Sequence, residues 1–168
     1  MYRIGEHVIH PGQGVCTVVG FKEVPAPMLV LEAKRGHAKT LMQYPVSQAS
    51  KLHPCISAEA AERLIVEFSS LECDPFTERN STLEETYFKQ RIKQGAPETV
   101  RVAKTMLVRI RDAKRRNKKP SSYYARVLKE ARRRALEELA CALEVSEEDL
   151  DARFCAIEEQ DGLAPSAN

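Results

Sequence analysis

The sequence predicts an α+β protein in which a small, strongly bent antiparallel sheet or β-barrel precedes a helical region of about five helices. In residues 1–53, short apolar runs alternate with Pro- and Gly-containing turns, which is typical of short antiparallel strands. From Pro54 onward the apolar residues follow the spacing of amphipathic helices, and helix-capping residues recur. We therefore expect two domains, residues 1–53 and 54–159, followed by a flexible tail over 160–168.

The first two strands are expected on either side of a tight turn. Val8 and Ile9 favour the first strand, and Pro11 ends it because proline cannot donate to the ladder. Gly14 gives the backbone the freedom to reverse. The second strand begins at Val15 and continues through a valine-rich run.

Two further strands complete the predicted sheet. The third covers residues 28–33, and a Gly-containing turn follows at 34–37. The fourth covers 39–44 and stops at Pro45. A segment of this length is short for an independent core, so we expect it to pack in part on the rest of the chain.

The first two helices carry recognisable start signals. Ser57 is expected to cap a helix over 58–68. After a polar loop, Ser81 with Glu84 three residues later fits a capping box. The second helix is then expected to run over residues 83–93.

Three more helices follow. Pro97 is compatible with the first turn of the third helix. Ser121 or Ser122 is expected to cap the fourth, and Ser146, with Asp149 three residues later, to cap the fifth. The apolar stripe expected to be buried on the third helix consists of Val100, Ala103, Met106, Leu107 and Ile110.

Composition excludes several classes of protein. The chain of 168 residues is 43% hydrophobic and 30% charged, an ordinary globular mixture. Its apolar runs are too short for a transmembrane helix, and its start lacks the apolar core of a signal peptide. The five cysteines form no Cys-x-x-Cys pair, which argues against a disulfide framework or a zinc ribbon. We expect a cytoplasmic protein with reduced thiols and no membrane partner.

Charge is strongly segregated along the chain although the net charge is only +2. Residues 101–134 hold 14 basic and 2 acidic side chains, a balance of +12, whereas residues 135–168 hold 1 and 10, a balance of −9. A basic segment of this kind is a candidate contact for nucleic acid or another polyanion. The alternative is a solvated helix face.

Helical spacing places several of these cations together. Arg101, Lys104, Arg111 and Arg115 fall on one side of the third helix, and Arg126, Lys129 and Arg133 do the same on the fourth. Such a surface would neutralise phosphates without reading bases. The residues predicted to bind DNA are Arg101, Lys104, Arg111, Lys114, Arg115, Arg116, Lys118, Lys119, Arg126, Lys129, Arg132 and Arg133.

Nothing in the sequence points to catalysis. The histidines are scattered over the β region, and no Gly-rich phosphate loop, nucleophile elbow or paired-carboxylate pattern is present. We therefore expect no enzymatic activity, no metal site, no cofactor and no small-molecule substrate.

Three segments, in this order, carry a resemblance to a known family. The first is the strand–turn–strand of residues 4–21, with Gln-Gly-Val after the proline; the second is residues 92–95, Ile-Lys-Gln-Gly. The third is the run from Ala131 to Ala140. Together they make the chain similar to the CarD/CdnL family of bacterial RNA-polymerase-binding transcription regulators, whose β domain also occurs in transcription-repair coupling factors.

The resemblance implies a Tudor-like β domain that docks on the β-subunit lobe of RNA polymerase. It also implies a helical domain that contacts double-stranded promoter DNA near the upstream edge of the bubble and so modulates open-complex stability. By strand addition, the docking segment would be Thr40, Leu41, Met42, Gln43, Tyr44 and Pro45. The alternative for Leu41 and Tyr44 is packing in the core.

Departures from the family pattern shape the expectation. The chain has no tryptophan, and Ser81 stands where the family carries a Trp wedge. Leu83 and Glu84 replace an arginine pair, and Gln43 stands where the polymerase contact often has Arg. Phe76 and Tyr87 are the aromatics nearby that could take the place of the wedge, but neither sits at the matching position. We expect a divergent member whose DNA contact is mostly electrostatic.

Two other functions remain open at this point. One is a basic helical nucleic-acid-binding protein unrelated to RNA polymerase. The other is an adaptor whose basic helices bind an acidic protein partner. The sequence does not decide between activation and repression of transcription.

Overall fold

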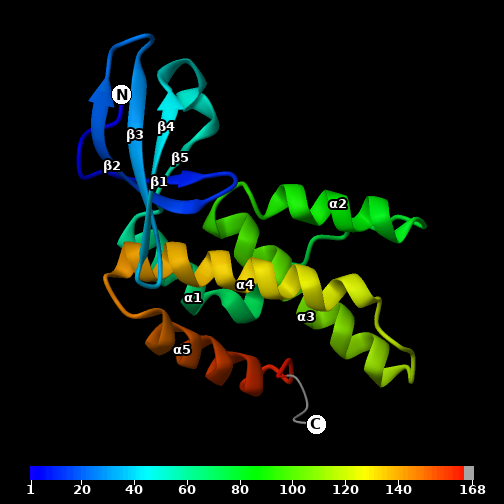
Figure 1. Ribbon diagram of the computed structural model, residues 1–168. Helices are drawn as coiled ribbons and strands as arrows, with labels where there is room; N and C mark the ends of the chain where they lie inside the picture. Colours follow the sequence, from blue (N-terminus) through cyan, green and yellow to red (C-terminus); the bar gives the residue numbers. More distant parts are fainter. Residues whose placement is uncertain (165–168) are drawn as a thin grey trace. The chain divides into compact units, whose positions relative to one another are not determined.

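The structure is a computed structural model that describes residues 1–164 (Figure 1). The chain divides into two compact units, Met1–Cys55 and a second that begins at Ile56. The first consists of strands and one short 3-10 helix, and the second of helices. The predicted α+β class, with a bent antiparallel sheet followed by a helical region, is confirmed.

Within residues 1–164 the strands form one antiparallel sheet of five strands in the order β4-β3-β2-β1-β5. The sheet is open, with β4 and β5 as its edges, so the bent-sheet form of the prediction holds rather than a closed barrel. A 3-10 helix, η1, precedes β5. The bounds are β1 His7–His10, β2 Gly14–Lys22, β3 Met28–Arg35, β4 Ala38–Pro45, η1 Val46–Lys51 and β5 His53–Pro54.

The sheet buries one of its faces. On β2 and β3 alternate residues are buried, as the two-residue period of a half-buried strand requires. Val8 of β1 lies opposite Cys16 of β2, and both are fully buried. The core of this unit consists of Val8, Cys16, Val18, Leu29, Leu31, Ala33 and Leu52.

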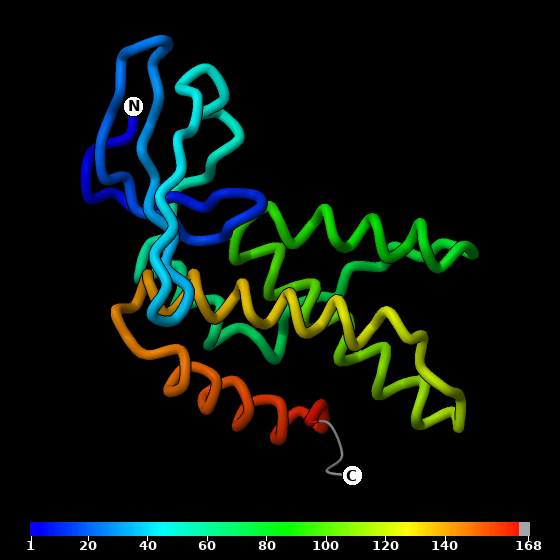
Figure 2. The backbone as a smooth tube through the Cα atoms, in the orientation of Figure 1, coloured from blue at the N-terminus to red at the C-terminus, as the bar shows by residue number. Residues whose placement is uncertain are grey.

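The second unit contains five α-helices and one short 3-10 helix within the described residues. Helices α3 and α4 are the longest, and they run side by side as a hairpin (Figure 2). The bounds are α1 Ala58–Val66, η2 Phe68–Ser70, α2 Ser81–Arg91, α3 Ala96–Arg115, α4 Ser122–Leu143 and α5 Glu147–Gln160.

Two of the predicted helix caps are confirmed. The Ser57 side chain accepts a hydrogen bond from the Ala60 backbone N–H, and Ser146 accepts one from Asp149. Ser121 occupies the N-cap position of α4 but makes no side-chain cap bond. These caps satisfy backbone donors that the first turn of a helix leaves unpaired.

The predicted capping box of α2 is wrong. Asn80, one residue earlier, is the N-cap, and its side chain accepts from the backbone N–H groups of Thr82 and Leu83. Glu84 does not reach back to Ser81, because its carboxylate is buried and bonded elsewhere.

Two apolar cores hold the helical unit together. The larger includes Ile65, Phe68 and Leu139, and the smaller includes Phe88 and Met106. Residues 160–163 of the predicted tail are structured, since α5 ends at Gln160 and Leu163 is buried in the larger core. Residues 165–168 of that tail lie outside the described residues. No helix within residues 1–164 has the length and apolar character needed to cross a membrane.

Candidate functional site

The structure divides the predicted DNA-binding cations into an exposed group and a paired group. Five exposed side chains gather where α3 ends and the chain turns toward α4, and we call them the cationic turn. Among the ion pairs of residues 1–164, none includes these five. The cationic turn consists of Lys114, Arg115, Arg116, Lys118 and Lys119.

A defined backbone geometry holds the cationic turn. Asn117 adopts a left-handed conformation with φ of 54°. The Lys118 N–H donates to the carbonyl of Ala113 at 2.9 Å, and the Asn117 N–H donates to that of Lys114 at 3.0 Å. This is a helix C-terminus closed by a left-handed residue, for which asparagine is a common choice. Cations are favoured here because the unpaired carbonyls carry partial negative charge.

Lys104 does not belong to the surface, contrary to the prediction. Its side chain is 7% exposed, and its ammonium donates to the carbonyls of Phe68 at 2.7 Å and Ser69 at 2.8 Å. The same ammonium lies 5.4 Å from the centroid of the Phe68 ring. Lys104 therefore anchors η2 to α3 from inside the unit.

Two further predicted cations of α3, Arg101 and Arg111, are half-buried. Arg101 donates from Nε to the carbonyl of Glu72 at 3.2 Å and so holds the loop after η2. Arg111 donates from Nε to the carboxylate of Asp112 at 3.1 Å. Neither is as available to a polyanion as the cationic turn.

The cations of α4 are mostly neutralised by carboxylates. Arg126 pairs with Glu85 at 3.1 Å, and Arg132 and Arg133 each bridge two carboxylates. The side chains of Arg133 and Arg134 hold the pKa of Glu130 down at about 2, which keeps this partner ionised. Lys129 is exposed. The continuous basic surface predicted along both helices is thus reduced to one end of the hairpin.

A buried polar network includes Glu84, one of the two residues that stand where the resembled family carries an arginine pair. Glu84 is 7% exposed, and Arg109 pairs with it at 3.0 Å. The Tyr123 hydroxyl also donates to Glu84, and the pKa of Tyr123 is raised by burial and by this bond. Arg109 donates as well to the carbonyls of Asp74 and Phe76, so the network fastens the loop before α2.

Sequence reasoning gave Arg109 no role, because its partners Glu84, Asp74 and Phe76 lie far away in the sequence. The only available signal was its spacing from Met106 and Leu107 of the apolar stripe, which places it close to that buried face.

The wedge position has no aromatic side chain. Ser81 is exposed in the first turn of α2. Phe76 stacks on Tyr87 with ring centroids 3.8 Å apart, and the Tyr87 hydroxyl donates to Asp74 at 2.9 Å. Both aromatics are therefore held within the unit rather than presented for insertion between bases.

Strand β4 offers an open edge. In the sheet formed by residues 1–164, β4 pairs with β3 on one side and has no strand on the other. Leu41 is 65% exposed, and Thr40 and Gln43 are also exposed, whereas Met42 and Tyr44 pack against the core and Pro45 is half-buried. Of the two residues for which core packing was the alternative, Tyr44 packs and Leu41 does not.

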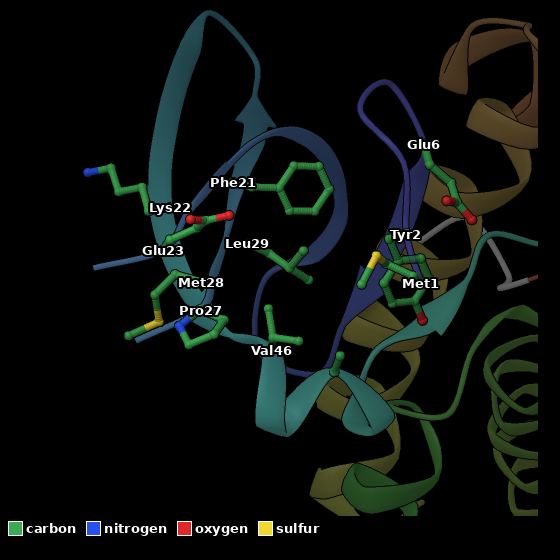
Figure 3. Close-up of a pocket in the computed structure, with 11 residues that line it drawn as sticks. Met1, Tyr2, Glu6, Phe21, Lys22, Glu23, Pro27, Met28, Leu29 and Val46 are labelled. Carbon is green, nitrogen blue, oxygen red and sulfur yellow. The ribbon is translucent and has the colours of Figure 1, made fainter. Parts of the chain in front are cut away.

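The sheet unit also contains an apolar groove of about 790 Å³ (Figure 3). Phe21 and Leu29 line it together with Val46, the residue that follows β4. Phe21 is 45% exposed there. Glu6, Lys22 and Glu23 supply the charged groups among its lining residues. An apolar side chain of a bound protein could enter this groove.

Beside the cationic turn lies a hollow of about 360 Å³. Arg116, Lys118 and Lys119 line it together with Tyr124 and with Ser121 at the N-terminus of α4. Glu84 and Asp112 also line it. Within residues 1–164, no group of three or more His, Cys, Asp or Glu side chains could hold a metal ion.

Comparison of the chain with models of protein families gives no match. Comparison with curated proteins gives no match either.

Proposed function

We propose that this protein is a bacterial transcription regulator that docks on the β-subunit lobe of RNA polymerase and contacts nearby double-stranded DNA without reading its sequence. The observation that carries the DNA contact is the cationic turn, whose five exposed cations have no ion-pair partner among residues 1–164. The polymerase partner rests on the resemblance of the N-terminal segment and on the open edge of β4. Such a protein acts in the cytoplasm, at the nucleoid.

The pairing pattern supports phosphate binding at one end of the α3–α4 hairpin. An arginine already held by two carboxylates, such as Arg132, gains little from a phosphate because it would have to give up its partners. A solvated cation such as Lys118 can replace the counterions of DNA at small cost. These contacts lie along the backbone, so they carry no base preference.

The exposure pattern of β4 supports strand addition. A partner strand could pair with the free backbone groups of β4, and Leu41 and Gln43 would contribute side-chain contacts. Because Gln43 replaces a residue that is often Arg in the resembled family, we expect this docking to depend more on backbone bonds and on Leu41 than on charge.

DNA binding is tested by the salt dependence of affinity for a random-sequence duplex, measured by fluorescence anisotropy. The double variant Lys118→Gln/Lys119→Gln should bind several-fold more weakly and lower the slope of log K against log salt by about 2. The matched control Arg126→Gln/Arg133→Gln removes the same charge from paired positions and should leave the slope unchanged. Equal losses in both variants, or binding that does not depend on salt, would overturn the DNA contact.

Polymerase docking is tested by calorimetry of the full chain with the isolated β-subunit lobe. Leu41→Asp should weaken binding at least tenfold, whereas Val66→Asp, on a comparably exposed apolar side chain of α1, should not. If the unmodified chain does not bind the lobe, the polymerase partner is excluded. DNA binding with no lobe binding would favour a basic helical nucleic-acid-binding protein, and lobe-independent binding of an acidic protein would favour an adaptor.

A further inference from the structure

We propose that a pocket on the other side of the cationic turn binds an acidic, leucine-rich segment of another protein. The pocket has a volume of about 350 Å³ and lies between α3, α4 and the turn that follows α5. We call it the lateral pocket. This inference goes beyond the proposed contacts with DNA and polymerase and does not depend on them.

The floor of the lateral pocket is apolar. Leu107 and Leu163 form its base and are 5% and 4% exposed. Ile110 and Leu128 line it as half-buried side chains. Ile110 continues the apolar stripe of α3, but among residues 1–164 it belongs to none of the three apolar cores. The helix therefore presents an isoleucine to a cavity instead of to its own core.

The rim of the lateral pocket is purely cationic within the described residues. Arg111, Lys114 and Arg115 line it, and no acidic side chain does. Lys114 and Arg115 are exposed members of the cationic turn. The guanidinium of Arg115 lies over Gly162, where a Cβ would stand 3.8 Å from its Nη2. Lys114 and Arg115 have no ion-pair partner among residues 1–164, whereas Arg111 pairs with Asp112. The two exposed cations beside an apolar floor complement a ligand that joins carboxylates to an aliphatic side chain.

Helical geometry assigns the cations to two different surfaces. Successive residues of a helix are rotated by about 100°, so Arg115, the last residue of α3, and Arg116, its C-cap, point in different directions. Arg116, Lys118 and Lys119 line the hollow next to Tyr124, and Arg111, Lys114 and Arg115 line the lateral pocket. A DNA phosphate is charged and gains nothing from contact with the aliphatic floor of the lateral pocket. A leucine side chain of a peptide fills the pocket and removes apolar surface from water.

A second copy of this chain fits the lateral pocket poorly. Its most acidic helix, α5, carries the negative charge, but the large apolar side chains Leu150 and Phe154 are 0% and 6% exposed. Those side chains are part of the core and are not available to enter a pocket. The occupant is therefore a segment of another protein that exposes leucines between acidic residues.

The test uses the full chain and a fluorescein-labelled peptide of about twelve residues in which Asp or Glu alternates with Leu. Binding is measured by anisotropy at physiological salt, where charges more than about 8 Å apart are largely screened. We expect saturable binding that is weakened at least tenfold in Ile110→Glu and in Lys114→Glu/Arg115→Glu. The matched control Lys118→Glu/Lys119→Glu makes the same change in net charge on the other surface and should weaken binding less than threefold.

A second peptide separates the pocket from general attraction between opposite charges. In it, serine replaces every leucine at the same charge, and we expect its affinity to be at least tenfold lower. Methyl NMR of the unmodified chain provides a readout that does not depend on variants. The leucine peptide should shift the methyl signals of Ile110, Leu128 and Leu163 before those of Leu41.

Several results would overturn the proposal. These are equal binding of the serine peptide, equal weakening in the control variant, or no saturable binding of the leucine peptide. If duplex DNA, rather than the peptide, shifts the Ile110 methyl, the lateral pocket is part of the DNA surface. If sedimentation shows a dimer that Ile110→Glu dissociates, the occupant is a second copy.

Discussion

Glu138 is a buried carboxylate at a point where two parts of the helical unit meet. It lies on α4 and is 4% exposed. Its Oε1 accepts from the backbone N–H of Ile56 at 3.3 Å, and the N–H of Ala96, at the start of α3, also bonds to it. Burial raises the pKa of Glu138 to about 7 despite these bonds.

Stability should therefore fall as the pH rises. The folded protein binds the proton of Glu138 more tightly than the unfolded chain, whose pKa lies near 4.5. Between pH 4.5 and pH 7 the contribution of this group to the unfolding free energy falls, by about 3 kcal/mol in total. Glu138→Gln stays neutral, so it should match the unmodified chain at pH 4.5 and exceed its stability at pH 8.

Urea unfolding of both proteins across this pH range measures the difference. Glu137→Gln is the neighbouring control; it loses an ion pair with Arg133 but should not show the same growing gap. A gap between Glu138→Gln and the unmodified chain that does not change with pH would show that folding does not raise the pKa of Glu138.

Lys104 gives a second prediction for a single residue. Lys104→Ala removes the ammonium that bonds to the carbonyls of Phe68 and Ser69 and also removes a packed side chain, so we expect a loss of about 2–4 kcal/mol in unfolding free energy. DNA affinity should not change. The exposed Lys129→Ala should stay within about 0.5 kcal/mol of the unmodified chain. If Lys104→Ala is as stable as the unmodified chain but binds DNA more weakly, Lys104 contributes to the DNA-binding surface after all.

Among the elements, α5 depends on one arginine of α4. Arg132 pairs with Asp151 at 2.8 Å and with the buried Glu158 at 2.6 Å. Removing Arg132 leaves Glu158 without its cation, and we expect Arg132→Ala to cost about 2–4 kcal/mol. Hydrogen exchange should show lower protection in α5, with α3 unchanged.

Arg133→Ala is the matched control for this experiment. Arg133 also bridges two carboxylates, Glu130 and Glu137, but both lie on its own helix. We expect a loss of no more than about 1 kcal/mol and no change in α5. If hydrogen exchange in α5 is the same in Arg132→Ala and Arg133→Ala, the ion pairs of Arg132 do not stabilise α5.

The sequence predicted elements well where the signal was local. Strands β1 to β4 and the five helices follow from turn residues, caps and apolar spacing. Strand β5 was missed because it has two residues, and its pairing of Val8 with Pro54 is a tertiary contact that no local pattern shows. The cap of α2 was misplaced by one residue, because Asn80 and Ser81 are both good caps in sequence and only the buried position of Glu84 decides between them.

The candidate site was predictable only in outline. Helical spacing placed Lys104 with the surface cations. In the structure its ammonium is buried because it donates to two carbonyls of η2, which lie 36 and 35 residues earlier in the chain. The partners of Arg132 come from α5 and are equally remote in sequence. Charge alone therefore identified the basic segment, while the division between paired and exposed cations required the fold.

At the scale of the molecule, the two compact units have separate cores. Within the described residues, no buried residue of the sheet core belongs to either helical core. Leu31 is fully buried in the sheet, and Leu31→Ala should cost about 2–5 kcal/mol there. Native-state hydrogen exchange should show the loss in β2 and β3 and not in α3 and α4. An equal loss in both units would show that the chain unfolds as one cooperative body.

The open edge of β4 also bears on colloidal behaviour. An edge strand of eight residues with one open side can pair edge to edge with other copies of the same protein and so lead to aggregation. Lys39 is exposed near one end of β4, and Pro45, which lacks an N–H, closes the other. A lysine and a proline are the residues with which natural sheets discourage such pairing. The edge of β4 can therefore pair with a partner strand, while Lys39 and Pro45 at its two ends disfavour pairing between copies of this chain that would lead to fibres.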